Sequence, residues 1–264
     1  MRKYGFTIIE LLVVIAVIAL LTAIAVPSMM AAKNRAQSIR CSSNLHQLSL
    51  GFMVYQQEYE VYPYGFCDVQ LGTAVPSTGY AGNAMYDKQG LWWFDYLQSS
   101  IEFDLEPGSI LWCPAGRRVP KSVQDNLLCG NYGVNRSVCK DAQGIVNTPF
   151  TDVALRASQI RQPSGTLLIS DSGYSLLSWL AATDTSQPVF ENINRTNFFY
   201  VPGLAFNQTR NELRDNPDAI KGRHPHQSLN VGFTDGHNEV RDAESLMIEK
   251  TLVNQGQLPQ LWVP

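Results

Sequence analysis

The chain opens with a long apolar segment and continues in a pattern that mixes apolar and polar positions. Between Ile8 and Val26 the polar side chains are those of Glu10 and Thr22. A helix of about 19 residues is roughly 28 Å long, which is enough to cross the hydrocarbon core of a bilayer. The pattern therefore predicts a membrane-spanning helix, and no second apolar segment of this length follows it.

Pro27 closes the apolar segment, and an amphipathic pattern occupies residues 28–59. Proline inside a helix removes one hydrogen bond, so we expect a kink at Pro27. Beyond it, apolar residues recur at spacings of three and four, at Cys41, Leu45, Leu48, Phe52, Tyr55 and Tyr59. This stripe predicts a helix that lays one face on a sheet and ends at Tyr62-Pro63. A coiled coil is disfavoured because paired flanking charges are missing.

The rest of the chain has the pattern of short strands joined by loops. Residues 166–170 form a run that ends at Asp171 and predicts a buried strand. Apolar positions alternate over residues 229–233, which predicts a strand with one buried face. The pair Asp235-Gly236 predicts a tight hairpin turn into a strand over residues 238–241.

Three other segments carry local signals. Asp242 is a candidate N-cap for a short helix over residues 243–253. The polar stretch 181–217 predicts a long surface insertion. Aromatic residues cluster at Trp92, Trp93, Phe94 and Tyr96. They predict a loop seated on the core, with an aromatic ligand platform as the alternative.

Composition and charge exclude some functions. The net charge of −3 gives no electrostatic basis for binding nucleic acid. No nucleophile elbow, phosphate-binding loop or paired-cysteine redox motif is present in the sequence. We therefore expect no enzymatic activity and no cofactor, with a divalent cation as the open alternative discussed below.

The chain has five cysteines, and their spacing matches no common zinc motif. In an exported domain, a disulfide is expected between Cys113 and either Cys129 or Cys139. The odd count leaves at least one thiol free or in an intermolecular bond. Cys41 lies on the buried stripe, where an inert core cysteine is the simplest interpretation.

Basic residues precede the apolar segment. Arg2 and Lys3 favour a cytoplasmic start, which places the rest of the chain on the outer side of the membrane. An ordinary secretory signal cut within residues 21–25 is the alternative. Glu10 argues against that alternative, because a carboxylate near hydrocarbon is costly unless it has a partner.

Residues 5–13, Gly-Phe-Thr-Ile-Ile-Glu-Leu-Leu-Val, resemble the cleavage and methylation motif of type IV prepilins and type II secretion pseudopilins. The resemblance implies that a prepilin peptidase cuts between Gly5 and Phe6 and N-methylates Phe6. It divides the chain into four parts: a leader 1–5, a transmembrane helix 6–27, an amphipathic helix 28–62 and a head domain 63–264.

Glu10 acquires a function in such a protein. Cleavage frees an amine at Phe6, and Glu10 of a neighbouring subunit can pair with it inside a filament. A buried pair of this kind would fix the axial register between subunits whose other contacts are apolar. The alternative is that Glu10 extends to the lipid headgroups.

The head resembles a pseudopilin-like family that has a histidine, about nine residues and then Asp-Gly near the C-terminus. The resemblance rests on residues 40–48, 110–114, 131–135 and 163–171. The C-terminal element departs from that spacing. Ten residues separate His224 from Asp235, and eight separate His226 from it. Either histidine is a candidate for the family position, with Gly236 completing the element.

The histidines near the C-terminus allow two interpretations. His224 or His226, together with Asp235 and His237, is a candidate metal or acid–base site. The structural alternative is that Asp235 and Gly236 shape the hairpin turn, while a histidine donates a hydrogen bond across its base.

Together these features predict an α+β pilin-like fold, with a long N-terminal helix packed on an antiparallel sheet. They predict a single-pass protein of the bacterial inner membrane with its head in the periplasm or outside the cell. The expected function is that of a subunit of a type II secretion pseudopilus or related filament. Expected partners are other pseudopilins, the prepilin peptidase, the inner-membrane assembly platform and lipid. Alternatives are a membrane-anchored binding module and a metal-dependent hydrolase.

Overall fold

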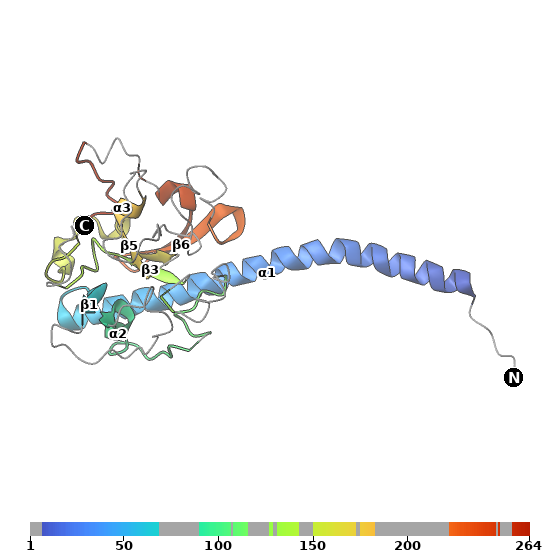
Figure 1. Ribbon diagram of the computed structural model, residues 1–264, viewed down its shortest axis with the longest axis horizontal. Helices are drawn as coiled ribbons and strands as arrows, with labels where there is room; N and C mark the ends of the chain where they lie inside the picture. The colour runs from blue at the N-terminus through green and yellow to red at the C-terminus, as the bar shows by residue number, and fades with distance from the viewer. Residues whose placement is uncertain are drawn as a thin grey trace.

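A computed structural model describes residues 7–68, 90–106, 108–115, 127–128, 131–142, 150–172, 175–182, 222–246, 248 and 255–264. One helix dominates it. Helix α1 runs over Ile8–Tyr59, 52 residues, and projects from the head as a long stalk (Figure 1). It continues through Pro27 as a single element with a gentle curve. It ends at Glu60, whose left-handed backbone (φ 62°) lets its N–H donate to the carbonyl of Gln56.

The head is built around a five-stranded sheet in the order β5-β3-β4-β6-β7. The strands are β3 (Tyr132–Asn135), β4 (Leu167–Asp171), β5 (Leu176–Leu177), β6 (Ser228–Phe233) and β7 (Asn238–Asp242). Strands β3 and β5 are parallel, and the other neighbours are antiparallel. The small strands β1 (Phe66–Asp68) and β2 (Gly90–Trp92) form a separate antiparallel pair.

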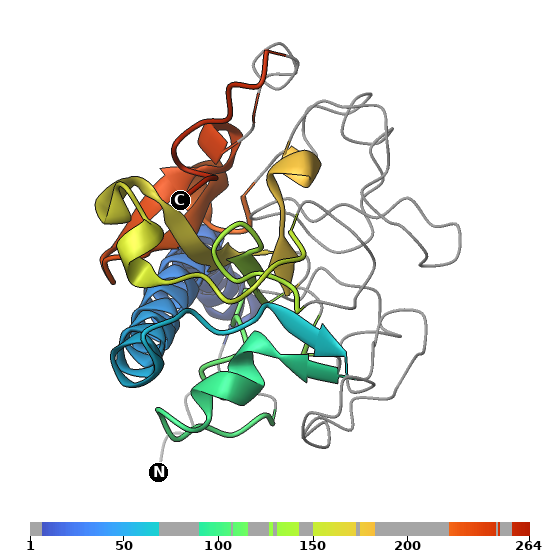
Figure 2. The ribbon, with the colours of Figure 1, turned by 90° about the vertical axis from the view of Figure 1, so that its left-hand side faces the viewer.

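The remaining elements are short. They are the helices α2 (Trp93–Leu97) and α3 (Trp179–Ala182), and the 3₁₀ turns η3 (Ala157–Gln159), η4 (Pro163–Gly165), η6 (Pro225–Gln227) and η7 (Ala243–Leu246). Figure 2 looks along α1 and shows the strands stacked beside the helix. The helix therefore covers one face of the sheet.

The outer half of α1 buries its apolar stripe against the sheet. Cys41, Leu45, Leu48 and Phe52 are fully buried, as the periodicity predicted. Phe52 stacks on Trp93 of α2, with ring centroids 5.6 Å apart. Tyr59 is 47% exposed, because the helix runs past the sheet before it ends. Trp92, Trp93 and Phe94 lie in the core, as expected, and Tyr96 is half-buried. The segment that they seat is strand β2 and helix α2, where a loop was expected.

A second cluster of apolar residues covers the opposite face of the sheet. Leu229, Val231 and Phe233 of β6 belong to it, together with Trp262 near the C-terminus. Strand β6 is therefore buried on both faces, and the prediction of a single buried face was wrong. The alternation in the sequence identified the side facing away from α1, while Gly232 lets the helix approach closely on the other side.

Strand β4 and the hairpin between β6 and β7 match their predictions. The positive φ of Gly236 (89°) forms the turn, and the N–H of Phe233 donates to the carbonyl of His237 across it. Asp242 caps the next element as expected, because its Oδ1 accepts the N–H of Glu244 at 3.0 Å. That element is the 3₁₀ turn η7, which ends at Leu246, and not an α-helix. Ile248 donates its N–H to the carbonyl of Ala182, and residues 247 and 249–253 lie outside the described residues. Residues 183–217 of the predicted insertion lie outside the described residues.

Candidate functional site

The start of α1 forms a capping box between Thr7 and Glu10. The backbone N–H and the hydroxyl of Thr7 both donate to Oε2 of Glu10, each at 2.8 Å. The N–H of Glu10 lies 3.3 Å from the Thr7 hydroxyl oxygen and donates to it. A capping box satisfies two of the helix's unpaired N–H groups and places a carboxylate at the positive end of its dipole. Glu10 thus has a partner within its own chain, which the sequence analysis missed although the Thr-x-x-Glu spacing signals it.

The other polar side chain of the apolar segment is satisfied in the same helix. The hydroxyl of Thr22 donates to the carbonyls of Ile18 and Ala19, at 2.9 and 3.0 Å. The apolar side chains around it are all exposed in the single chain. Within the described residues, α1 is the helix that is long and apolar enough to cross a membrane. Gly5 and Phe6, the predicted processing positions, lie outside the described residues.

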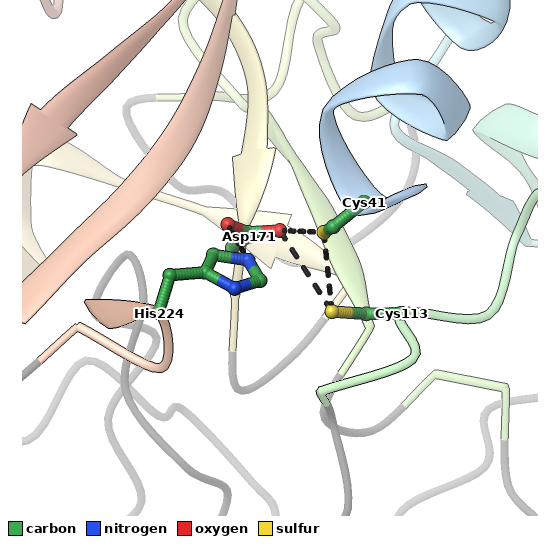
Figure 3. Close-up of side chains that lie close together, drawn as sticks. All are labelled: Cys41, Cys113, Asp171 and His224. Carbon is green, nitrogen blue, oxygen red and sulfur yellow. Dashed lines mark hydrogen bonds and ion pairs between the residues drawn. The ribbon is translucent and has the colours of Figure 1, made fainter. Parts of the chain in front are cut away.

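A second group of functional side chains lies where α1 meets the head. Cys41, Cys113, Asp171 and His224 are all buried, and their metal-ligating atoms lie within 4.8 Å of one another. They come from four separate segments and converge on one point (Figure 3). Below we call these four residues the Cys–Asp–His cluster.

The sulfur atoms of the cluster lie close together. Sγ of Cys41 is 3.2 Å from Sγ of Cys113 and also 3.2 Å from the hydroxyl oxygen of Tyr132. The Cys41 thiol donates to Oδ1 of Asp171 at 2.7 Å, and Sγ of Cys113 lies 4.0 Å from the same oxygen. The carboxylate therefore faces both sulfur atoms.

Asp171 is held at the end of β4 by donors from the neighbouring strand. The N–H and the side-chain amide of Asn230 both donate to its Oδ2, at 2.7 and 3.1 Å. Nε2 of His224 lies 2.9 Å from the same oxygen. Neither ring nitrogen of His224 makes a hydrogen bond of good geometry with the described part of the chain.

Local backbone structure fixes the other members. The N–H of Cys113 donates to the side-chain oxygen of Asn131 at 3.0 Å. His224 precedes η6 and pairs with Ser228 through an antiparallel bridge. Gly222 permits this tight loop, because a Cβ there would lie 2.1 Å from the carbonyl oxygen of Ser228.

Burial and charge set opposite protonation states for the two thiols. Burial raises the pKa of Cys41, and the hydrogen bond with Cys113 and the charge of Asp171 raise it further. Burial also acts to raise the pKa of Cys113, but the hydrogen bond with Cys41 and the charge of Arg223 outweigh it and bring the pKa to about 5. Cys113 is therefore the thiol that ionises first.

The carboxyl and the imidazole stabilise each other as ions. Burial would raise the pKa of Asp171, yet the contact and charge of His224 and the charge of Arg223 lower it. Burial would lower the pKa of His224, yet Asp171 and then Cys113 raise it to about 9. The cluster thus balances negative and positive groups in a buried space.

The predicted histidine site is only partly assembled. His224 belongs to the cluster, whereas His226, Asp235 and His237 are exposed. Nδ1 of His237 lies 2.5 Å from Oδ1 of Asp235, and its ring stacks on Phe233 with centroids 4.3 Å apart. Asp235 and Gly236 shape the hairpin turn, so the structural interpretation fits these two residues. His224 lies beside Asp171 instead.

The cysteine predictions need correction. Cys113 and Cys139 are both free thiols, so the expected Cys113–Cys139 disulfide is wrong. Cys113 faces Cys41 instead, because the loop that carries it packs against α1. Cys129 lies outside the described residues. Cys41 is buried in the core as expected, but its neighbours are polar.

Each segment that carries the family resemblance contributes to this meeting point. Residues 40–48 supply Cys41, residues 110–114 supply Cys113, and residues 163–171 supply Asp171. Residues 131–135 supply Tyr132, which contacts Cys41. Segments far apart in the sequence thus meet in one cluster, which no local pattern had indicated.

The long apolar helix and the sheet that it covers define an α+β pilin-like protein, and the apolar part of α1 fits a membrane anchor. Residues 1–26 match the family described as the prokaryotic N-terminal methylation motif, the signature of type IV pilins and pseudopilins. The motif supports a pilin-like subunit that is processed by prepilin peptidase and assembles with similar subunits. No curated protein and no solved structure matches the chain significantly.

Proposed function

We propose that the chain is a structural subunit of a pseudopilus, in a type II secretion system or a related machine, and that it has no enzymatic activity. The observation that carries this proposal is the exposed apolar surface of α1. Ile8, Leu12 and Ile24 are each more than half exposed in the single chain. Lipid or the same helices of neighbouring subunits must cover such a surface.

Exposed apolar side chains also occur beyond the length of a membrane span, although charged residues such as Lys33 and Arg35 lie among them. These apolar side chains include Met29, Met30, Ile39, Leu50, Met53 and Val54. Residues 29–54 lie past the roughly 20 residues that a bilayer core accommodates, so lipid does not cover all of them. Helix packing within a filament would cover them.

The capping box refines the proposed pairing between Glu10 and the amine of Phe6. Oε2 of Glu10 accepts both bonds from Thr7. Oε1 is therefore available for the freed amine of a neighbouring subunit. The same carboxylate can start its own helix and neutralise that amine, so the two contacts need not compete.

Two substitutions separate these contacts. Glu10→Gln keeps a side chain that can complete the capping box but removes the charge. Thr7→Val removes the hydroxyl of the cap but keeps the charge of Glu10. Each variant is overproduced in cells that carry the protein's own assembly machine, and the sheared filament fraction is measured. We expect Glu10→Gln to lose assembly at least about 10-fold, since a buried pair broken on one side costs several kcal/mol, and Thr7→Val to assemble as the parent does.

Intact mass provides the second test. Protein from its own membrane should lack residues 1–5 and carry one added methyl group. A cut near Ala25 would contradict the assignment. So would normal assembly of Glu10→Gln, because the pairing would then have no function in the filament.

The alternatives have less support. Trp92 and Trp93 are 1% exposed each, so they offer no ligand surface for a binding module. For a hydrolase, Asp235 and His226 would have to join His224, and both lie on the surface while His224 faces Asp171. A structural role in the filament requires neither arrangement.

A further inference from the structure

We propose that the Cys–Asp–His cluster binds one zinc ion that joins α1 to the head. The cluster offers two sulfur ligands, one carboxylate and one imidazole, which is a donor set that zinc prefers over calcium or magnesium. All four residues are buried. The site differs from the surface histidine site considered from the sequence, with which it shares only His224.

The spacing of the donor atoms suits a tetrahedral ion. Zinc bond lengths of about 2.0–2.3 Å place the atoms of a tetrahedron roughly 3.3–3.8 Å apart. The cluster has separations of 3.2 Å between the sulfur atoms and 4.0 Å from Cys113 to Oδ1 of Asp171. The separation of 2.7 Å between Sγ of Cys41 and Oδ1 would have to widen.

A disulfide between Cys41 and Cys113 is the competing chemistry for the same atoms. It would require the sulfur atoms to close from 3.2 Å to about 2.05 Å. It would also remove the thiol that donates to Oδ1 of Asp171, and a buried carboxylate oxygen would lose its donor. A disulfide gives no function to Asp171 and His224, whereas a zinc ion uses all four side chains.

The imidazole of His224 supports the ion over the disulfide. Its side chain is 1% exposed, and Nε2 lies 2.9 Å from Oδ2 of Asp171. Neither ring nitrogen has a hydrogen bond of good geometry among the described residues. The imidazole and the carboxylate therefore already lie close enough together to share one ion.

Residues around the cluster hold the ligands in place. Asn230 donates twice to Oδ2 of Asp171, and the hydroxyl of Tyr132 lies 3.2 Å from Sγ of Cys41. The thiolates and carboxylate carry more negative charge than a divalent ion neutralises. Arg223 lies beside them, held by its hydrogen bonds to the carbonyls of Asn131 and Ser172.

Four protein ligands and full burial describe a closed structural zinc site rather than a catalytic one, which keeps a position open. The ligands come from α1, the loop at Cys113, the end of β4 and the loop before β6. An ion bound there would fix the helix to the sheet at Cys41, where the buried stripe of α1 begins.

The test uses the full-length chain, extracted from its membrane in mild detergent without reductant or chelator. Zinc is measured by elemental analysis, and the protein is then incubated with zinc sulfate, desalted and measured again. We expect about one zinc per chain, retained after desalting. Cobalt(II) offered to the metal-free protein should give the charge-transfer absorption of a thiolate complex.

Matched variants assign the ligands. Cys113→Ser and His224→Gln should each lower retained zinc at least about 10-fold, since loss of even an outer partner can do so. Cys139→Ser is the control, because Cys139 is an equally buried thiol outside the cluster. It should keep its zinc.

Peptide mapping under non-reducing conditions distinguishes the zinc site from a Cys41–Cys113 disulfide. A Cys41–Cys113 disulfide in the isolated protein overturns the proposal, and so does a reduced protein that retains no zinc after incubation. Zinc that survives in both Cys113→Ser and His224→Gln would also overturn it. These measurements do not depend on filament assembly, so they are separate from the test of the proposed function.

Discussion

At the scale of single residues, close contacts decide which positions tolerate change. Gly232 lies on β6 beneath α1, opposite Asn238 of β7. A Cβ at this position would lie 2.7 Å from Oγ of Ser49 and 2.9 Å from Cγ2 of Ile169. Ser49 is fully buried on α1, so it has little room to move. The glycine therefore sets the distance between helix and sheet.

Gly232→Ala should lower the free energy of unfolding by about 1–3 kcal/mol, the usual cost of overpacking a core. Urea unfolding followed by circular dichroism measures this change. Gly165→Ala is the control, because a Cβ there would meet its nearest neighbour at 3.5 Å, an ordinary contact. An equal cost for both variants would show that backbone freedom matters and the contact with Ser49 does not.

At the scale of elements, α1 serves two environments with one continuous backbone. Its buried residues within the described chain begin at Cys41 and include Leu48. Leu50, on the same helix, is 44% exposed. The two leucines test which face of the helix stabilises the head.

Leu48→Ala should cost about 2–5 kcal/mol of unfolding free energy, because it leaves a cavity between α1 and the sheet. Leu50→Ala should stay within about 0.5 kcal/mol, as surface substitutions usually do. Thermal and urea unfolding of the pair provide the measurement. If Leu50→Ala proved the more damaging, the orientation of α1 on the sheet would be wrong.

Elements with a strong local pattern could be predicted from the sequence. The apolar run gave the span, the spacings of three and four gave the buried stripe, and Asp235-Gly236 gave the hairpin. The predicted cap at Asp242 formed, but a 3₁₀ turn follows it in place of an α-helix. Ile248 bonds to Ala182, a contact between distant segments that no local pattern contains. Tertiary contacts overrode a weak propensity there.

The candidate site could be predicted less well than the fold. Cys41 and Asp171 are separated by 130 positions in the sequence, so no spacing rule connects them. Cys113 was expected to pair with a cysteine nearby in the chain, whereas the fold places it against α1. The spacing of Thr7 and Glu10 is that of a capping box and could have predicted it. The cost of a carboxylate in an apolar segment predicted a partner in another subunit instead.

At the scale of the whole molecule, the anchor and the head are separable. The apolar part of α1 has no side chain buried against the head. Among the described residues, the hydrophobic core thus lies in the part of the chain that begins near Cys41.

A chain that begins at Ser28 should therefore stay in solution without detergent and unfold within about 1 kcal/mol of the parent, since it loses no core contact. Size-exclusion chromatography and urea unfolding measure the two properties. A chain that begins at Leu45 is the matched comparison. It lacks Cys41 and should unfold more easily; a truncation at Ser28 that is equally unstable would mean that the first half of α1 contributes to folding.

Because α1 continues through Pro27 as one helix, the rotation of the head about the helix axis is coupled to its distance from the membrane-spanning part. Each residue added or removed between the span and Cys41 turns the head by about 100° around the helix axis and displaces it by about 1.5 Å. Adding or removing about seven residues returns the head almost to its original orientation but displaces it by roughly 10 Å along the helix axis. The length of this stretch therefore dictates which side of one head meets the next around the filament.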